Sequence, residues 1–152
     1  MAESQPWYAA YPPPRSEPVA LKREDVLALM RNKVAGRDYV LVDLRRVDHE
    51  GGTICGSINL PAQSLYLSLG TLYTMFKAAE VTTVIWYCGS SRGRGSRAAA
   101  WFADYISDHA GGADTEMQSV ILEGGIKGWA AAGKEFTALM DGYDEDVWKA
   151  AS

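Results

Sequence analysis

The sequence predicts a single α/β domain with a central, mainly parallel sheet flanked by helices. Short apolar runs rich in β-branched and aromatic residues, which indicate buried strands, alternate along the chain with longer segments whose apolar residues recur at helical spacing. Such alternation is typical of parallel sheets whose strands are connected through helices. The length of 152 residues suits one compact domain. We therefore expect the ligand site at the carboxyl ends of the strands.

Residues 1–18 form a proline-rich segment that precedes this domain. They contain five of the six prolines of the chain, including the run Pro12–Pro14. This composition predicts a flexible tail with local polyproline II structure, followed by one catalytic domain over residues 19–152. Three aromatic residues leave a second interpretation open, in which the segment lies over the domain or contacts a partner. They are Trp7, Tyr8 and Tyr11.

In the first half of the domain we expect two helices and two strands. A helix is expected from Lys22 until about Gly36, because apolar residues recur there at helical spacing. Residues 39–44 read as a buried strand, and 57–60 as a shorter one that Pro61 closes. A second helix is expected over 65–79, with Ser64 as its N-cap and an apolar face of Leu65, Leu69, Leu72 and Phe76.

In the second half we expect two more core strands and three helices. Residues 82–87 (Thr-Thr-Val-Ile-Trp-Tyr) form a buried strand, and an alanine-rich helix follows over 95–107. A third core strand is expected at 119–122, just before two consecutive glycines. Short helices are expected at 126–132 and 144–150.

Composition excludes several classes of function. A net charge of −4 does not favour general binding to nucleic acid or to anionic membranes. No apolar run reaches the roughly 18–20 residues of a membrane span, and the first residues lack the features of a signal peptide. Two cysteines do not form a disulfide framework, so we expect the protein in the cytoplasm or the nucleus. Because His49 and His109 have no neighbours at ligand spacing, we expect no metal site.

A cysteine stands at the end of the strand over 82–87. Cys88 begins the run Cys-Gly-Ser-Ser-Arg-Gly-Arg, which ends at Arg94, and the alanine-rich helix follows. Small residues let consecutive backbone N–H groups turn inward and bind an anion, and the start of the helix adds partial positive charge. Arg94 is expected to bridge two oxygens of a bound oxyanion. The expected anion-binding residues are Gly89, Ser90, Ser91, Arg92 and Gly93.

The same charges favour the thiolate form of Cys88, because a helix N-terminus and nearby cations stabilise a thiolate. No Asp or Glu occurs from residue 81 to residue 103, whereas Arg92, Arg94 and Arg97 do. Cys88 is therefore the expected nucleophile, and Cys88 with Arg94 the expected catalytic pair.

Three segments, taken in order, resemble the rhodanese-like domain. Val-Asp-Leu-Arg at 42–45 and the run over 50–61 resemble its Val-Asp-x-Arg and Gly-His-Ile-x-Gly-Ala-x-Asn-Leu-Pro signatures. Leu-Glu-Gly-Gly-Ile-Lys-Gly-Trp at 122–129 resembles the signature near that domain's C-terminus. With the Cys88 loop between them, the resemblance covers roughly residues 20–134 and implies a three-layer rhodanese-like fold.

The loop from Cys88 to Arg94 has seven residues, and this length distinguishes between subfamilies of the rhodanese-like domain. Sulfur-transferring rhodaneses generally carry a loop of six residues, sized for sulfur. Cell-division-cycle dual-specificity phosphatases and the related eukaryotic arsenate reductases carry Cys-x5-Arg, sized for phosphate or arsenate. The chain also ends its loop with Arg-Gly-Ser-Arg, which is similar to the phosphatase ending Arg-Gly-Pro-Arg. The resemblance therefore implies an enzyme of the phosphatase or arsenate reductase type.

The chain departs from these phosphatases at several positions. Tyr87 stands where they usually have His, which alters the support of the thiolate, and Arg92 stands where they have Glu. Thr53 replaces the His of the Gly-His-Ile signature. Leu44 occupies the place of a second cysteine that protects the nucleophile, and Cys55 lies in a different loop.

The resemblance also suggests supporting residues. It implies that Asp43, at the end of a core strand, braces the domain near the loop, and that Arg45 pairs with a carboxylate. Glu123 ends the third core strand, where it orients Arg94, supplies a proton or has a structural role. The general acid stays open among Glu123, Asp48 and the proton of the substrate itself.

The expected function is that of a cysteine-dependent phosphatase acting on phosphorylated Tyr, Ser or Thr of a phosphoprotein, or on a small aryl phosphate. This chemistry needs no cofactor. The alternative is an arsenate reductase that uses the same loop on another oxyanion, with glutathione and glutaredoxin as reductant and partner. Sulfur transfer through a Cys88 persulfide and a catalytically inactive module that binds phosphorylated partners are less favoured.

Overall fold

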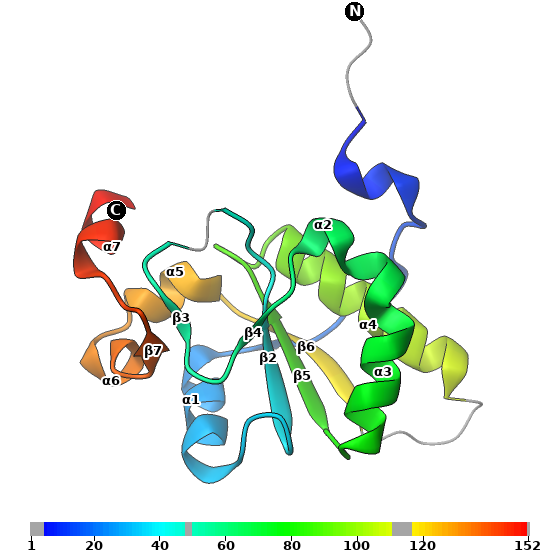
Figure 1. The fold of residues 1–152 in the computed structure, drawn as a ribbon, viewed down its shortest axis with the longest axis horizontal. Coiled ribbons are helices and arrows are strands. Elements are labelled where there is room, and N and C mark those ends of the chain that lie inside the picture. The colour runs from blue at the N-terminus through cyan, green and yellow to red at the C-terminus, as the bar shows by residue number, and fades with distance from the viewer. Residues whose placement is uncertain (1–4, 48–49, 111–116, 152) are drawn as a thin grey trace, which may run out of the picture.

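The computed structural model describes residues 5–47, 50–110 and 117–151, and it confirms the expected α/β architecture (Figure 1). Asp48 and His49 lie outside the described residues. A five-stranded parallel sheet has the order β1-β6-β5-β2-β4. Its strands are β1 (Ala20–Leu21), β2 (Tyr39–Asp43), β4 (Ile58–Asn59), β5 (Thr83–Tyr87) and β6 (Gln118–Leu122).

Helices cover both faces of this sheet and make three layers (Figure 1). One face packs on α2 (Ala62–Leu65), α3 (Leu69–Ala78) and α4 (Arg94–His109). The other face packs on α1 (Arg23–Asn32), α5 (Gly125–Ala130) and α6 (Lys134–Thr137). The chain ends in α7 (Glu145–Ala151). In the part of the chain that is described, no helix has the length and apolar character needed to cross a membrane.

Alternation along the central strands separates two hydrophobic cores. In β5, Val84 and Trp86 face α3 and α4, whereas Ile85 and Tyr87 face α1 and α5. Successive side chains of a strand point to opposite faces. Cys88 continues this pattern and lies on the α4 side of the sheet.

The fold differs from the expected elements at several points. The first helix ends at Asn32, before the expected end near Gly36, and β1 and α6 were not expected. The helix expected over 65–79 starts earlier, at Ala62 directly after Pro61, and is interrupted by a 3₁₀ turn at Tyr66–Ser68. The Ser64 hydroxyl donates to the Pro61 carbonyl oxygen and caps no helix. A two-stranded antiparallel sheet, β3 (Thr53–Ile54) with β7 (Met140–Asp141), was not expected from the sequence.

From Trp7 on, aromatic residues of the proline-rich segment pack on the domain. After a 3₁₀ turn at Trp7–Ala10, the Tyr11 ring stacks on the Tyr66 ring with centroids 4.6 Å apart. The indole N–H of Trp101 donates to the Pro12 carbonyl oxygen at 2.9 Å. Aromatic contacts and backbone hydrogen bonds thus hold the segment, as in the second interpretation that the sequence leaves open.

Candidate active site

The Cys88 loop joins the middle strand of the sheet to α4. β5 pairs with β2 on one side and with β6 on the other, so the loop leaves the centre of the sheet at its carboxyl edge. Cys88 is 3% exposed. Its Sγ accepts hydrogen bonds from the backbone N–H of Ser91 at 3.2 Å and of Gly95 at 3.4 Å. Such inward N–H groups form an anion-binding nest around the position of the sulfur.

The loop bends sharply at Ser91. This residue has φ = 63°, in the left-handed region that non-glycine residues seldom adopt. The Ser96 hydroxyl donates to the Ser91 carbonyl oxygen at 2.7 Å and so ties the bend to α4. Arg94 is the first residue of α4 and is half-buried. Of the remaining predicted anion-binding residues, Ser90, Arg92 and Gly93 are exposed and Gly89 is half-buried.

A second helix holds the start of the loop. At the N-terminus of α5, the N–H of Ile126 donates to the Cys88 carbonyl oxygen and the N–H of Lys127 to the Gly89 carbonyl oxygen, both at 3.0 Å. A Cβ at Gly125 would lie 2.5 Å from each of these two oxygens. The two carbonyls therefore point toward α5, and glycine is required where the helix meets the loop.

We predict that Gly125→Ala lowers kcat/KM of any reaction that depends on the Cys88 loop by about 100-fold. A displacement of about 1 Å at reacting groups has an effect of this size. The added methyl group would push the Cys88 and Gly89 carbonyls out of place. Gly36→Ala is the matched control, since Gly36 also has a positive φ but nothing within 4 Å of an added Cβ. Steady-state kinetics of both variants measure the effect, and equal losses would contradict the prediction.

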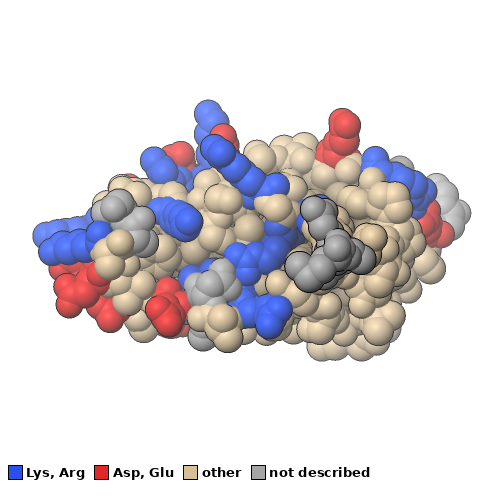
Figure 2. Space-filling view, turned by 90° about the horizontal axis from the view of Figure 1, so that it is seen from above, with Lys and Arg blue, Asp and Glu red and all other residues tan. Residues whose placement is uncertain are grey.

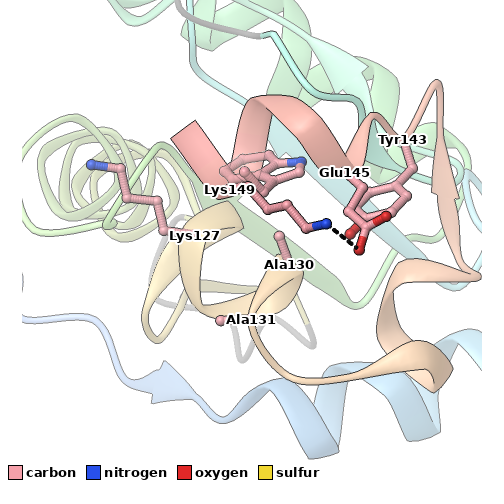
Figure 3. A pocket seen from close by; sticks show the side chains of 7 residues that line it. Lys127, Ala130, Ala131, Tyr143, Glu145 and Lys149 are labelled. Atoms are coloured by element: carbon pink, nitrogen blue, oxygen red, sulfur yellow. Dashed lines mark ion pairs between the residues drawn. The ribbon is translucent and has the colours of Figure 1, made fainter. Parts of the chain in front are cut away.

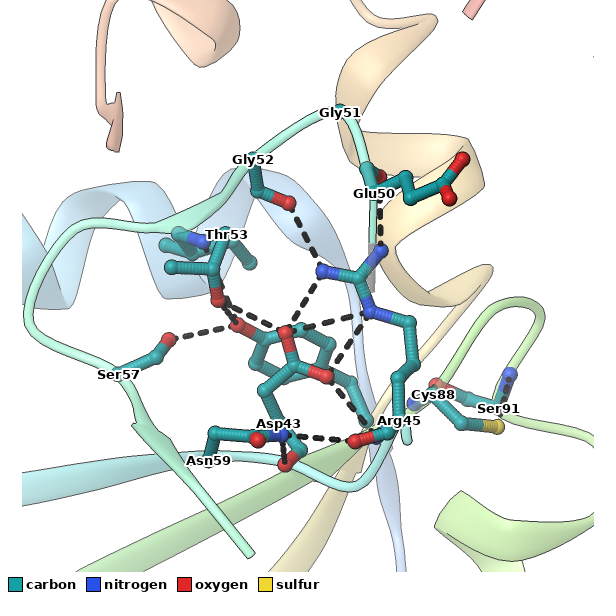
Figure 4. Close-up of polar contacts among 12 residues, drawn as sticks. Asp43, Arg45, Glu50, Gly51, Gly52, Thr53, Ser57, Asn59, Cys88 and Ser91 are labelled. Atoms are coloured by element: carbon teal, nitrogen blue, oxygen red, sulfur yellow. Dashed lines mark hydrogen bonds and ion pairs between the residues drawn. The ribbon is translucent and has the colours of Figure 1, made fainter. Parts of the chain in front are cut away.

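A buried ion pair braces the strand next to the loop (Figure 4). Asp43 and Arg45 are both almost fully buried, and the Arg45 Nη2 lies 2.7 Å from the Asp43 Oδ2. The guanidinium also donates to the backbone carbonyl oxygens of Glu50 and Gly52. The expected carboxylate partner of Arg45 is therefore Asp43, and the pair ties the end of β2 to the 50–52 turn.

Tyr87, the residue before Cys88, points to the opposite face of the sheet. Its hydroxyl contacts the Thr53 hydroxyl at 2.8 Å and the Ser57 hydroxyl at 2.6 Å, and it accepts the N–H of Ile54 (Figure 4). Burial, with the nearby Asp43 carboxylate second, raises the pKa of Tyr87 to about 12. The side chain thus fixes the 53–57 segment under the end of β5.

We predict that the protein loses stability as the pH rises from 10 to about 12, at about 1.4 kcal/mol per pH unit. The pKa of Tyr87 is raised in the folded state, so the folded state binds more protons than the unfolded state in this window. Denaturant unfolding at several pH values measures the slope. Tyr87→Phe removes the hydroxyl, and an unchanged slope in that variant would contradict the assignment.

Glu123 stands apart from the ion-pair system of Asp43. It follows β6 at the carboxyl edge of the sheet, and its side chain is exposed. Its backbone N–H donates to the Leu21 carbonyl oxygen, and its carboxylate forms no ion pair with another described residue. The roles of Glu123 as a proton donor or as a partner of Arg94 stay predictions.

Cys55 lies beside the small sheet and not in the Cys88 loop. It is half-buried, and its Sγ lies 3.2 Å from the Asp141 Oδ1. Burial, followed by the hydrogen bond to Asp141, raises the pKa of the thiol to about 11. Cys55 is therefore a protonated thiol near neutral pH, a weak nucleophile. Within the described ranges, no group of three or more His, Cys, Asp or Glu side chains is arranged to hold a metal ion.

Comparison with known proteins agrees with the observed fold. Residues 24–132 match the model of the rhodanese-like domain. The chain is 28% identical over 99 residues to Arsenical-resistance protein 2 of Saccharomyces cerevisiae, which covers 61% of this chain and 75% of that protein.

Among solved structures, the fold is similar to Ygr203w, described as a yeast protein tyrosine phosphatase of the rhodanese family. The TM-score is 0.66 at 23% identity, over 88% of this chain and 99% of that one. It is also similar to the As-Sb reductase from Leishmania major, with a TM-score of 0.59 at 23% identity over 71% of this chain and 73% of that one. At these identities the two structures show the fold alone.

Proposed function

Because the chain belongs to the rhodanese-like domain family, we propose that it is a cysteine-dependent phosphatase built on that fold. The observation that carries this proposal is the Cys88 sulfur, enclosed by the N–H groups of Ser91 and Gly95 at the start of a 16-residue helix. A tetrahedral oxyanion placed above the sulfur would find donors for its oxygens and a nucleophile for its central atom.

In the proposed reaction the Cys88 thiolate attacks phosphorus in line with the leaving oxygen. The S–P bond forms as the P–O bond to the substrate breaks, and the leaving oxygen takes up a proton. Arg94 and the loop N–H groups stabilise the charge on the three equatorial oxygens. Water then attacks the cysteinyl-phosphate, which releases inorganic phosphate and regenerates the thiolate. The proton donor is Glu123, Asp48 or the substrate itself.

The proposed substrates are phosphorylated Tyr, Ser or Thr in a protein, and small aryl phosphates. The seven-residue loop from Cys88 to Arg94 favours phosphate over the smaller sulfur of sulfurtransferases. We propose that the protein meets these substrates in the cytoplasm, with the nucleus as a second location.

Arsenate reduction is the second candidate function, and it is favoured by similarity to a protein named for arsenical resistance. Arsenate has the same shape and charge as phosphate and would occupy the same loop. Cys88 would form an S–As bond as one oxygen of arsenate takes up a proton and leaves as water, which gives a thiol–arsenate adduct. Glutathione, with glutaredoxin as partner, would supply the two electrons that convert arsenate to arsenite. The raised pKa of Cys55, about 11, disfavours it as an internal reductant and so favours an external thiol.

Three assays on one purified preparation distinguish these functions. The proposal predicts release of phosphate from 3-O-methylfluorescein phosphate under reducing conditions, with inorganic arsenate as a competitive inhibitor. Arsenite formation that requires glutathione and glutaredoxin, without phosphate release, would replace the phosphatase by the reductase. Formation of thiocyanate from thiosulfate and cyanide, without activity in the other two assays, would show sulfur transfer. Inactivity of the folded protein in all three assays would indicate a binding module.

A further inference from the structure

A pocket of about 420 Å³ lies between α5 and α7 (Figure 3). This volume falls in the range of ligand sites, about 300–1,000 Å³. Neither the proposed chemistry of Cys88 nor the N-terminal segment uses it. Its lining residues are Lys127, Ala130, Ala131, Tyr143, Glu145, Trp148 and Lys149.

Lys127 connects this pocket to the loop. Its backbone N–H is bound to the Gly89 carbonyl oxygen, and its Cε lies 3.6 Å from the position of a Cβ built at Gly89. The lysine side chain therefore runs along the residue that follows the nucleophile. It is exposed, and no ion pair joins it to another described residue. An anionic group of a ligand would find a cation here.

Apart from Lys127, the pocket is lined mainly by apolar groups. Ala130, Ala131 and the rings of Tyr143 and Trp148 give it apolar walls. The Trp148 indole N–H is bound to the Gly51 carbonyl oxygen, which fixes that wall. Lys149 pairs with Glu145 at 3.4 Å on the far side, and Figure 3 shows Lys127 extending away from this pair.

The surface around the loop carries positively charged side chains. Figure 2 views the molecule from above, toward the carboxyl edge of the sheet, and lysine and arginine side chains gather near the middle of this face. A peptide with acidic residues near its phosphorylated residue would be attracted to it. Such a peptide extends from the loop in at least one direction, and Lys127 both lies against Gly89 of the loop and lines the α5–α7 pocket.

We propose that the α5–α7 pocket is a second binding site for a phosphorylated peptide: a carboxylate next to the phosphorylated residue pairs with Lys127, and an apolar side chain beyond it enters the pocket. This proposal rests on the phosphatase function. It names the substrate class as acidic phosphopeptides with a neighbouring apolar residue.

The test uses selectivity ratios, because a ratio cancels any effect of a variant on the phosphate site itself. Phosphotyrosine peptides with Asp or with Asn on both sides of the phosphotyrosine are compared by kcat/KM at low ionic strength. We expect a ratio of about fivefold for the unaltered protein, the upper end of the range for an exposed ion pair. Lys127→Met should reduce it to about one, whereas Lys134→Met, an exposed lysine of α6, should leave it unchanged.

A second pair of peptides probes the apolar wall. With Leu or Ser at the next position, the unaltered protein should prefer Leu by about five- to tenfold, and Tyr143→Ala should remove most of that preference. A ratio near one for both pairs in the unaltered protein would overturn the proposal, as would full retention of the ratios in the two variants.

Binding separates this proposal from the phosphatase proposal. The Kd values of the same peptides are measured by fluorescence polarisation with Cys88→Ser, alone and combined with Lys127→Met or Tyr143→Ala. The ratio of the two Kd values in each peptide pair is then compared between these variants. Turnover without selectivity would overturn only the second site. Selective binding that depends on Lys127, without turnover of any peptide, would overturn the phosphatase and support the site. Absence of both would overturn both.

Discussion

Cys88→Ser is expected to lower kcat/KM for 3-O-methylfluorescein phosphate by at least about 1,000-fold, because the hydroxyl that replaces the thiolate is a far weaker nucleophile. The site around it would stay the same. Two N–H groups, that of Ser91 in the loop and that of Gly95 in the first turn of α4, point at this position, and serine has nearly the volume of cysteine. The loss should therefore appear in kcat, with little change in the affinity for phosphate.

Cys55→Ser is the matched control, since it makes the same chemical change at the other cysteine of the chain. Its thiol lies beside Asp141 in another part of the fold and has a pKa of about 11. We expect its kcat/KM within about twofold of the unaltered protein, the usual range for a substitution outside the site. Thermal unfolding of both variants checks that they fold. Equal activity of the two variants would contradict the assignment of Cys88 as the nucleophile.

Arg45→Met is expected to lower the free energy of unfolding by about 3–5 kcal/mol, the cost of leaving one partner of a buried ion pair alone. The substitution would leave the Asp43 carboxylate without its cation in a site that is 0% exposed. It would also remove the donors to the carbonyl oxygens of Glu50 and Gly52. Urea unfolding measures the change.

Two further variants isolate the cause. Arg37→Met removes an exposed arginine that pairs with Asp38 at 3.7 Å, and its effect should stay within about 0.5 kcal/mol. In Asp43→Leu/Arg45→Met no buried charge is left alone, so at least about 1 kcal/mol of the loss should be regained. A double variant as unstable as Arg45→Met would show that the carbonyl contacts, and not the lone carboxylate, account for the effect.

The central part of the fold could be predicted because its strands are buried on both faces. Continuous apolar runs gave the strands over 39–44, 82–87 and 119–122 to within one residue, and helical periodicity gave α4. β1, β3 and β7 were not predicted, because strands of two residues have no periodicity. β4 is equally short and was predicted, because Pro61 marks its end.

The loop from Cys88 to Arg94 could be predicted as a unit, whereas the contacts that support it could not. The glycines at 124 and 125 were noticed as part of a signature, but only the structure shows the Gly125 position pressed against two loop carbonyls. Tyr87 was interpreted only as a replacement for histidine. Alternation along β5 would have placed it opposite Cys88, but its hydroxyl partners depend on how the 53–57 segment folds back.

The most direct test of the account is to trap the covalent intermediate on Cys88. Protein mixed with excess 3-O-methylfluorescein phosphate is quenched in acid within one turnover, digested, and analysed by mass spectrometry. A cysteinyl-phosphate mechanism predicts one phosphoryl group on the peptide that contains Cys88, and none on that peptide in Cys88→Ser. Turnover with no phosphoryl group on that peptide, or with the group on another residue, would contradict it.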